Sequence, residues 1–341
     1  MSEIKVNSIK GVSASSAAIS INNTDGTCTA NVTNIPLRNL FINGALDVSQ
    51  RGNSYASANA YTADQWYVFV TGVTATRLTT SPPDGFTHYI RFPSATNSPI
   101  MSQQIELEAQ GKAGKYKGKT VTVSWYARSE SSNKMYVDAA FKNASGGGNY
   151  TTIVSGSGSA QDITSSWARY TQTFTISVDP HANNKCFSIM IRTPSSGSGS
   201  TGTLELTGFQ AEFGSVATDF EHRSFTEEFN RCLRYYEQFN SNGLTEAVFA
   251  SGYFEANGQG RHALLYHKKR AAPTITASAA STFMNLNTGG VPGVDTITIR
   301  KQTETGAEFQ LVAGTDGSDG NGCILASKDS TEATIKISAE L

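Results

Sequence analysis

Aromatic side chains set among hydrogen-bonding side chains are the main chemical resource of this sequence. Its 341 residues include 13 Tyr, 17 Phe and 3 Trp, among abundant Ser, Thr and Asn. Flat rings stack on the apolar faces of sugars, while polar neighbours hydrogen-bond the sugar hydroxyls. The candidate residues for glycan contacts are Tyr126, Arg128, Tyr136 and Tyr150. The alternative, that these tyrosines pack in a core or at a subunit interface, stays open.

The sequence contains no clear catalytic or metal-binding motif. The sequence has no phosphate-binding loop, no H-E-x-x-H and no G-x-S-x-G. Glu106 and Glu108 would share one face of a strand and could act as a hydrolytic pair, but a solvated face is the preferred interpretation. Residues 316–322 evoke a calcium loop but lack its terminal Glu. We therefore expect no enzyme activity, no cofactor and no metal.

Charge restricts the partners. Lys and Arg number 27 against 28 Asp and Glu, so the net charge is −1, and charged residues make up only 16%. This balance argues against nucleic-acid binding and against polybasic attachment to a membrane. The first residues, 1–6, form no secretion signal, and no apolar run reaches the roughly 18 residues of a membrane span. We expect synthesis in a cytoplasm and no membrane insertion.

Alternation with a period of two indicates an all-β fold. In residues 121–128, Val121, Val123, Trp125 and Ala127 share one face of a strand, which leaves Tyr126 and Arg128 on the other. The three tryptophans are interpreted as core anchors: Trp66, Trp125 and Trp167. Further strands are expected at 135–141, 167–178, 187–192 and 203–213, separated by Ser- and Gly-rich loops.

One helix divides this β region from a second one. Ser224 and Glu227 form a capping-box pattern, and an apolar helical face of Phe225, Phe229, Cys232, Leu233 and Tyr236 predicts a helix over 224–239. The predicted organisation is a jelly-roll β-sandwich, one linking α-helix and a second, smaller β-sandwich domain, preceded by an extended N-terminal arm. Their expected ranges are 1–37 for the arm, 38–222 for the jelly roll, 223–243 for the helix region and 244–341 for the second domain.

Three stretches resemble virion appendage proteins of tailed bacteriophages. The opening of their domain resembles residues 39–52 (NLFINGALDVSQRG) with 61–66 (YTADQW), and its close resembles 208–223 (GFQAEFGSVATDFEHR) with 231–236 (RCLRYY). Residues 268–276 (KKRAAPTIT) are similar to their C-terminal region.

Two segments, 117–128 and 166–174, resemble strands of the jelly-roll carbohydrate-binding modules attached to glycan-degrading enzymes. Those modules end on a strand of the type D-D-x-x-L-E, whose acidic pair residues 207–212 (TGFQAE) lack. The shared strands imply the fold and not a binding affinity, and the missing acidic pair is a departure from the pattern at the place of a module-type calcium or ligand contact.

These resemblances imply a tail fibre or a related receptor-binding appendage. We therefore expect a homotrimer that attaches to a phage tail or baseplate protein through residues 1–37 and binds a glycan on the host cell surface. The protein would be made in the host cytoplasm and would reside in the virion. Two alternatives remain: a purely structural virion component, such as a head fibre, collar or baseplate part, and a glycan depolymerase.

Overall fold

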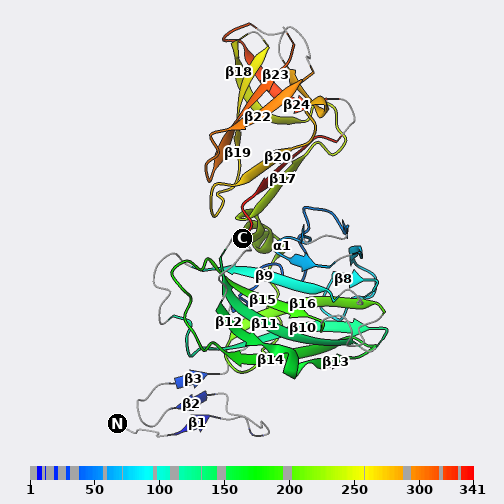
Figure 1. The fold of residues 1–341 in the computed structure, drawn as a ribbon, viewed down its shortest axis with the longest axis vertical. Coiled ribbons are helices and arrows are strands. Elements are labelled where there is room, and N and C mark those ends of the chain that lie inside the picture. The colour runs from blue at the N-terminus through cyan, green and yellow to red at the C-terminus, as the bar shows by residue number, and fades with distance from the viewer. Residues whose placement is uncertain are drawn as a thin grey trace.

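The computed structural model describes residues 6–9, 12, 19–21, 28–30, 38–56, 60–70, 72–94, 98–107, 115–131, 133–143, 151–194, 202–256, 258–286, 293–314, 318–328 and 332–341. Two β bodies are stacked along its long axis, and a small N-terminal sheet lies beyond the larger body (Figure 1). Within these residues, every strand pair is antiparallel. The predicted all-β class, a jelly-roll sandwich followed by a helix and a smaller β-sandwich, is confirmed.

Two sheets form the larger body. The six-stranded sheet consists, in spatial order, of β14 (Ala168–Thr175), β10 (Thr120–Ser129), β16 (Leu204–Phe213), β8 (Tyr89–Phe92), β7 (Ala75–Leu78) and β4 (Ser54–Tyr55). The seven-stranded sheet consists of β12 (Thr151–Ser155), β11 (Asn133–Lys142), β15 (Cys186–Arg192), β9 (Ile100–Glu106), β6 (Tyr67–Phe69) and β5 (Ala60–Tyr61), with β13 (Gln161–Ile163) also paired to β11. The short 3₁₀ helix η1 (Gly156–Ser159) follows β12.

The core lies between these two sheets. Val121, Val123, Trp125 and Ala127 of β10 point inward and are fully buried, as the alternation predicts. Trp66 is fully buried as well, so two of the three predicted anchors are confirmed. Burial of large apolar side chains contributes about 1.5–3 kcal/mol each, and this shared core holds the two sheets together.

A β-bulge adjusts β16 to its neighbour. The register between β10 and β16 shifts after Ser124, so that Trp125 faces two residues, Gly208 and Phe209. Gly208 has φ +62°, a left-handed conformation that favours glycine at a bulge. Phe209 thereby enters the core, where its ring lies 4.4 Å from that of Trp66.

Helix α1 (Phe225–Leu233) begins as predicted but ends early. The Ser224 Oγ accepts a hydrogen bond of 3.2 Å from the Glu227 amide. The expected helix over 224–239 is too long, because Tyr236–Asn240 forms strand β17 and pairs with β25. Cross-strand pairing thus overrides the local helical period. The predicted buried face is also incomplete, since Phe225 is 60% exposed.

The smaller body is a second sandwich. Its three-stranded sheet consists of β17, β25 (Thr334–Ser338) and β20 (Thr274–Ala277). Its six-stranded sheet consists of β21 (Phe283–Leu286), β24 (Gly322–Ser327), β18 (Val248–Ala256), β19 (Gln259–Leu265), β23 (Gly306–Val312) and β22 (Thr296–Arg300); the 3₁₀ helix η2 (Ala280–Thr282) precedes β21. One core cluster contains residues of both sheets, for example Ile335 and Phe309.

The N-terminal segment contributes three short strands. They are β1 (Ser8–Ile9), β2 (Ile19–Ile21) and β3 (Cys28–Ala30), and they pair in that order. Apart from these strands and residues 6, 7 and 12, the predicted arm, 1–37, lies outside the described residues. No helix in the described part of the chain has the length and apolar character of a membrane span.

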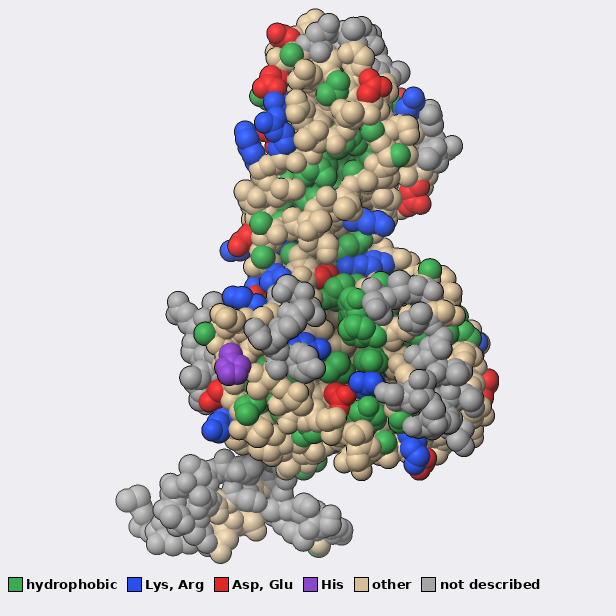
Figure 2. Space-filling model, in the orientation of Figure 1, with side chains coloured by type: hydrophobic (Ala, Val, Ile, Leu, Met, Phe, Trp, Pro, Cys, Tyr) green, Lys and Arg blue, Asp and Glu red, His purple; other side chains and the backbone are tan. Residues whose placement is uncertain are grey.

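The two bodies meet at a polar junction, and charged side chains gather around the narrower region between them (Figure 2). Arg51 of the jelly roll lies 2.9 Å from Glu340 of the smaller body and 3.4 Å from Asp64. Its guanidinium carbon is 3.4 Å from the centroid of the Tyr236 ring. Tyr61 donates a hydrogen bond of 2.8 Å to the carbonyl of Leu341. The junction therefore places two buried carboxylates around one arginine.

Candidate functional site

Tyr126 lies on the outer face of the six-stranded sheet, as the alternation predicts, but other side chains occupy its ring. Its centroid is 5.1 Å from that of Phe86, and the Arg169 guanidinium carbon lies 6.0 Å from it. Below the ring lies Gly208, where a Cβ atom would come within 2.7 Å of Tyr126 Cδ2. The ring thus packs within the protein.

Arg128 lies on the same outer face and is also engaged. Its guanidinium forms an ion pair with Glu205, whose side chain is 4% exposed. The guanidinium carbon also lies 4.9 Å from the centroid of the Trp167 ring. Arg128 is therefore held by a buried carboxylate and an aromatic ring.

Trp167 does not lie in the core, so its predicted anchoring role is wrong. Tyr170 and Phe174 of β14 point into the core, and the period of two places Trp167 on the opposite face. Its ring meets that of Tyr89 edge-on at 5.5 Å, and its Nε1 donates a hydrogen bond of 3.0 Å to the Ser81 carbonyl.

Tyr136 lies on the outer face of the other sheet, because Met135 and Val137 beside it point into the core. It is 5% exposed, and burial raises the pKa of its hydroxyl. Packed sheets lie about 10 Å apart, so Tyr136 cannot share a site with Tyr126 and Arg128. Tyr150 lies outside the described residues. The predicted candidates are therefore not assembled into one site.

The outer face of the seven-stranded sheet brings together residues that the sequence did not single out. Cross-strand pairing aligns them in two rows that cross β11, β15, β9 and β6. One row contains Asp138, Met190, Ser102 and Tyr67, and the other contains Tyr136, Arg192, Ile100 and Phe69. Neighbouring strands are about 4.8 Å apart, so each row extends roughly 14 Å.

Half-buried aromatic rings gather at one end of these rows. The Tyr67 ring centroid lies 4.5 Å from that of Phe69 and 5.1 Å from that of Tyr61. All three side chains keep part of their surface exposed. Tyr136 stands at the opposite end, with the Arg192 guanidinium carbon 5.6 Å from its ring centroid.

Polar side chains lie between the rings. Arg192 and Asp138 form an ion pair of 3.3 Å, so the charge in the middle of the face is balanced. The buried hydroxyl of Ser188 and the Nε of Arg192 have no hydrogen-bond partner among the described residues. Gln104 donates to the Ser102 hydroxyl at 3.1 Å. The face thus combines partly exposed rings with a balanced ion pair and with serine hydroxyls that are buried beneath the neighbouring side chains.

The sequence carried a weak signal for this face. Tyr67 and Phe69 alternate with the buried Val68, the pattern of a half-buried strand, but β6 has only three residues. Ser102 and Ser188 are ordinary small polar residues until pairing brings their strands together. The pairing register between strands that are distant in the sequence decides which residues become neighbours on this face, and local sequence patterns do not encode that register.

Glu106, considered above as half of a hydrolytic pair, takes part in the junction. It forms an ion pair of 2.9 Å with Arg234, and Tyr235 donates a hydrogen bond of 3.3 Å to it. Its proposed partner, Glu108, lies outside the described residues.

His262 and Cys323 form a buried pair in the smaller body, with Nε2 and Sγ 3.3 Å apart. Burial lowers the pKa of His262 to about 4 and raises that of Cys323 to about 11. The pair is therefore a neutral imidazole beside a thiol, without the thiolate that cysteine nucleophiles need.

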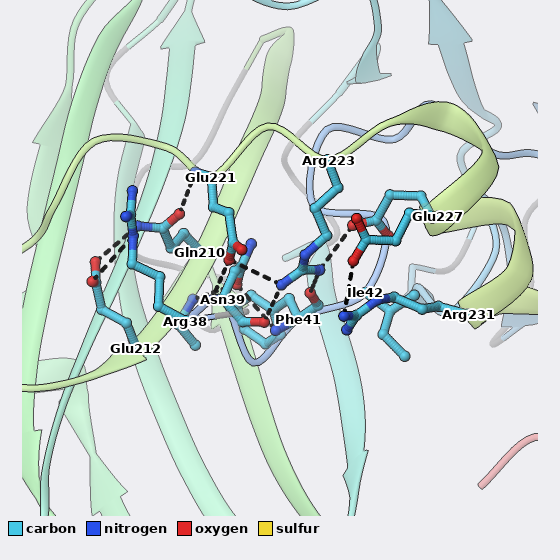
Figure 3. Close-up of polar contacts among 12 residues, drawn as sticks. Arg38, Asn39, Phe41, Ile42, Gln210, Glu212, Glu221, Arg223, Glu227 and Arg231 are labelled. Atoms are coloured by element: carbon cyan, nitrogen blue, oxygen red, sulfur yellow. Dashed lines mark hydrogen bonds and ion pairs between the residues drawn. The ribbon is translucent and has the colours of Figure 1, made fainter. Parts of the chain in front are cut away.

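The stretches that resemble phage appendage proteins meet in one hydrogen-bond network (Figure 3). Arg223, 2% exposed, donates from its Nη atoms to the carbonyls of Phe41 (3.0 Å) and Asn39 (2.5 Å) and to the carboxylates of Glu228 (2.8 Å) and Glu221 (3.1 Å). The Asn39 amide nitrogen donates to Glu221 at 2.7 Å. These motif residues close the jelly roll and anchor α1.

The same network covers the outer face of the six-stranded sheet. Gln210 accepts a hydrogen bond of 2.8 Å from the Glu221 amide, and Glu212 accepts one of 2.9 Å from the Thr218 amide. Both side chains are buried beneath the segment 214–223. This part of the face is therefore occupied by the chain itself.

Part of the chain is similar to known proteins. Residues 97–197 match the family model described as a carbohydrate binding domain. Among curated proteins, none matches the chain. A solved structure titled for CBM4 structure and function is 18% identical, with 50% of this chain and 98% of that chain covered and a TM-score of 0.31. The xylan-binding CBM22-1 domain of Paenibacillus barcinonensis Xyn10C is 12% identical, with 52% and 96% covered and a TM-score of 0.32.

A bacteriophage protein is also among the similar structures. The enzymatically active domain of tailspike protein 4 of bacteriophage CBA120 is 14% identical, with 52% of this chain covered and a TM-score of 0.34. The match spans only 22% of that tailspike chain. Because these identities and scores are low, we draw no functional conclusion from the three structures. The family match lies within the larger body, where residues 97–197 are similar to a carbohydrate binding domain.

Proposed function

We propose that the jelly roll binds a neutral saccharide chain across the outer face of its seven-stranded sheet. The observation that carries the proposal is the group of partly exposed rings, Tyr61, Tyr67 and Phe69, beside the hydrogen-bonding row of β9 and β15. Sugar rings stack on such aromatic surfaces while their hydroxyls pair with amides, hydroxyls and guanidinium groups.

The charge of this face favours a neutral ligand. Asp138 is occupied by Arg192 and also accepts a hydrogen bond of 2.9 Å from the Gly156 amide. Its carboxylate is therefore committed to the protein, and we propose binding without cleavage of the glycan. A hydrolytic site would need a second carboxyl group about 5–9.5 Å away and free to react.

At the level of the whole chain, we propose a non-enzymatic virion protein of the tail-fibre type that binds a host cell-surface glycan during adsorption. The support is the resemblance of residues 39–52 and 208–223 to phage appendage proteins, together with the carbohydrate-binding match. The proposal includes a homotrimer attached to the tail or baseplate through residues 1–37. Three copies would raise a weak single-site affinity through avidity.

A glycan-binding assay tests the site. The full chain is titrated with a panel of neutral polysaccharides, and the Tyr67→Ala/Phe69→Ala variant should bind at least tenfold more weakly, a loss of about 1.4 kcal/mol. Tyr253→Ala is the matched control, because Tyr253 is 53% exposed on the smaller body and should leave affinity unchanged. Equal binding by the double variant, or no binding to any glycan, would overturn the proposed site.

Two further measurements test the role of the whole chain. Immunogold labelling of virions should place the protein on the tail, and the mass of the intact protein in solution should equal three chains. The purely structural alternative would be favoured if the protein were found on the head or collar and if the free protein did not inhibit adsorption of the phage. Release of reducing ends from a bound polysaccharide would favour the depolymerase.

A further inference from the structure

A cavity opens on the outer face of the six-stranded sheet, on the opposite side of the jelly roll from the aromatic rows. Its volume is about 240 Å³. It is lined by Arg91, Arg128, Ser129, Glu130, Ser165, Thr203 and Glu205. These residues come from β8, β10 and β16 and from the loops beside them, so the sheet register fixes the cavity.

A buried carboxylate positions two arginines at this cavity. Glu205 Oε1 accepts a hydrogen bond of 2.6 Å from Arg91 Nε, and Oε2 accepts one from Arg128 Nε. The Glu205 side chain is 4% exposed, whereas Arg91 is 41% and Arg128 28% exposed. Both arginines use Nε for Glu205, and Arg128 also has a side-chain hydrogen bond with Tyr89, so the Nη atoms of Arg91 and the remaining Nη donors of Arg128 are left for another partner.

Aromatic rings fix Arg128 further. Its guanidinium carbon lies 4.9 Å from the Trp167 centroid and 6.0 Å from the Tyr89 centroid. The Trp167 ring is itself held by its hydrogen bond to Ser81 and its edge-on contact with Tyr89. Two guanidinium groups are thus oriented before any ligand arrives, which lowers the cost of binding.

The cavity lining contains two arginines and two carboxylates, so its formal charge is zero. Glu205 is buried and is bound through the Nε atoms of both arginines, whereas Glu130 is exposed, so water screens its charge. Guanidinium groups bind carboxylate and phosphate oxygens through paired N–H donors.

We infer that this cavity binds the oxyanion of an acidic saccharide, either a sugar carboxylate or a sugar phosphate, through the Nη atoms of Arg91 and Arg128. This inference goes beyond the proposed function and does not depend on it, because the two sites lie on opposite faces of the jelly roll and bind ligands of different charge.

Three sugars of similar size test the inference: D-glucuronate, D-glucose 6-phosphate and uncharged D-glucose, titrated calorimetrically into the full chain at low salt. The titrations use the full chain carrying Tyr67→Ala/Phe69→Ala, which removes the proposed neutral site, and in it we expect at least one anionic sugar to bind and glucose not to bind. The stronger anion identifies the source of the oxyanion. Inorganic phosphate is a fourth ligand, and we expect it to bind more weakly than the preferred sugar.

The test variant is Arg91→Gln, because it leaves the buried Arg128–Glu205 pair in place and the fold intact. It should weaken binding of the anionic sugar at least tenfold. Arg300→Gln is the matched control, since Arg300 is also 41% exposed but lies on the smaller body. Tyr67→Ala should leave the anionic sugar bound even if neutral binding fails.

Four results would overturn the inference. They are no binding of either anionic sugar, unchanged binding by Arg91→Gln, equal binding of glucose, and equal binding of inorganic phosphate. With Tyr67→Ala/Phe69→Ala removing the neutral site, equal binding of glucose would make the cavity a neutral-sugar site. Equal binding of inorganic phosphate would show that the sugar ring contributes nothing to recognition.

Discussion

The two outer faces of the jelly roll use similar residue types for different purposes. On the six-stranded sheet, Tyr126, Gln210 and Glu212 are paired with other parts of the chain, and a small arginine-lined cavity lies beside them. On the seven-stranded sheet, Tyr67 and Phe69 keep open ring surface. An aromatic or polar residue on an outer face is therefore available to a ligand only where no segment of the chain covers it.

The covering segment explains the difference. Residues 214–223 run over the six-stranded sheet, and Arg223 ties them to the opening segment at Phe41. These stretches are the most recognisable parts of the sequence, yet the contacts they make are internal. A recognisable motif here marks the closure of a domain, whereas the partly exposed rings of Tyr67 and Phe69 on the seven-stranded sheet lie outside these motifs.

The largest expected effect is on this closure. Arg223→Ala removes a 2%-exposed guanidinium and leaves the part-buried Glu228 and Glu221 without it. Breaking a buried pair in this way costs about 3–5 kcal/mol. Urea unfolding should show this loss, and Arg223→Lys, which keeps the charge but not the fork of donors, should lie between the variant and the original protein.

Arg231→Ala is the control for helix α1. Arg231 forms an exposed i,i+4 pair with Glu227 at 3.1 Å, which should contribute less than about 0.5 kcal/mol. A loss from Arg223→Ala as small as the loss from Arg231→Ala would contradict a structural role for the motif. Where both variants remain folded, the seven-stranded face should keep its glycan affinity.

Local patterns predicted most of the fold. The alternation of Val121, Val123, Trp125 and Ala127 gave the correct inward face of β10, and Ser224 correctly marked the start of α1. The helix end was wrong because β17 pairs with a strand about 100 residues away along the chain. Local patterns contain no information about such distant pairing.

The candidate site was less predictable for the same reason. Tyr126 and Arg128 were placed on the correct face, but the sequence does not show that residues 214–223 cover it. Trp167 was misassigned because tryptophan usually indicates a core, although the parity of β14 places it outside. The pairing of β6, β9 and β15 aligns the aromatic rows, and no local pattern specifies that register.

The next effect is the dependence of stability on pH, which arises at the junction between the two bodies. Tyr61 belongs both to this junction and to the aromatic group on the seven-stranded face. Burial raises the pKa of Glu340 to about 7, against the attraction of Arg51. Asp64 beside the same arginine also has a pKa raised by burial. The folded protein holds the Glu340 proton more tightly than the unfolded chain does, so protonation of Glu340 stabilises the folded state. This contribution to the free energy of unfolding is complete below about pH 4.5 and is lost as pH rises through 7.

Urea unfolding of the Glu340→Gln variant at pH 5 and pH 8 measures this effect. The original protein should lose on the order of 1–2 kcal/mol more than the variant over that interval, a value reduced from the full shift because Asp64 is coupled to the same arginine. Glu304→Gln is the control, since Glu304 is 48% exposed and pairs with the exposed Lys268. An identical pH slope in all three proteins would contradict a protonated junction.

A smaller effect sharpens the contrast between the two faces. Tyr126→Phe removes only a hydroxyl from a ring that packs against Phe86, so affinity for a neutral glycan should change less than twofold. Tyr67→Phe on the other face should weaken binding somewhat if the hydroxyl contacts the sugar. A loss of glycan affinity in Tyr126→Phe, with Tyr67→Phe unaffected, would move the neutral site to the six-stranded sheet.

The smallest expected effect is the response of neutral binding to salt. The Asp138–Arg192 pair balances charge at the centre of the seven-stranded face, so contacts there depend on stacking and neutral hydrogen bonds. Raising NaCl from about 0.05 to 0.5 M shortens the Debye length severalfold and should change neutral-glycan affinity less than about twofold. The affinity of an anionic sugar for the Arg91–Arg128 cavity should fall over the same range, by a factor several times larger than the change for the neutral glycan. Both ligands are titrated at the same series of salt concentrations, so that each face is the control for the other. Equal dependence of the two affinities on salt would show that charge contributes equally to binding at the two faces.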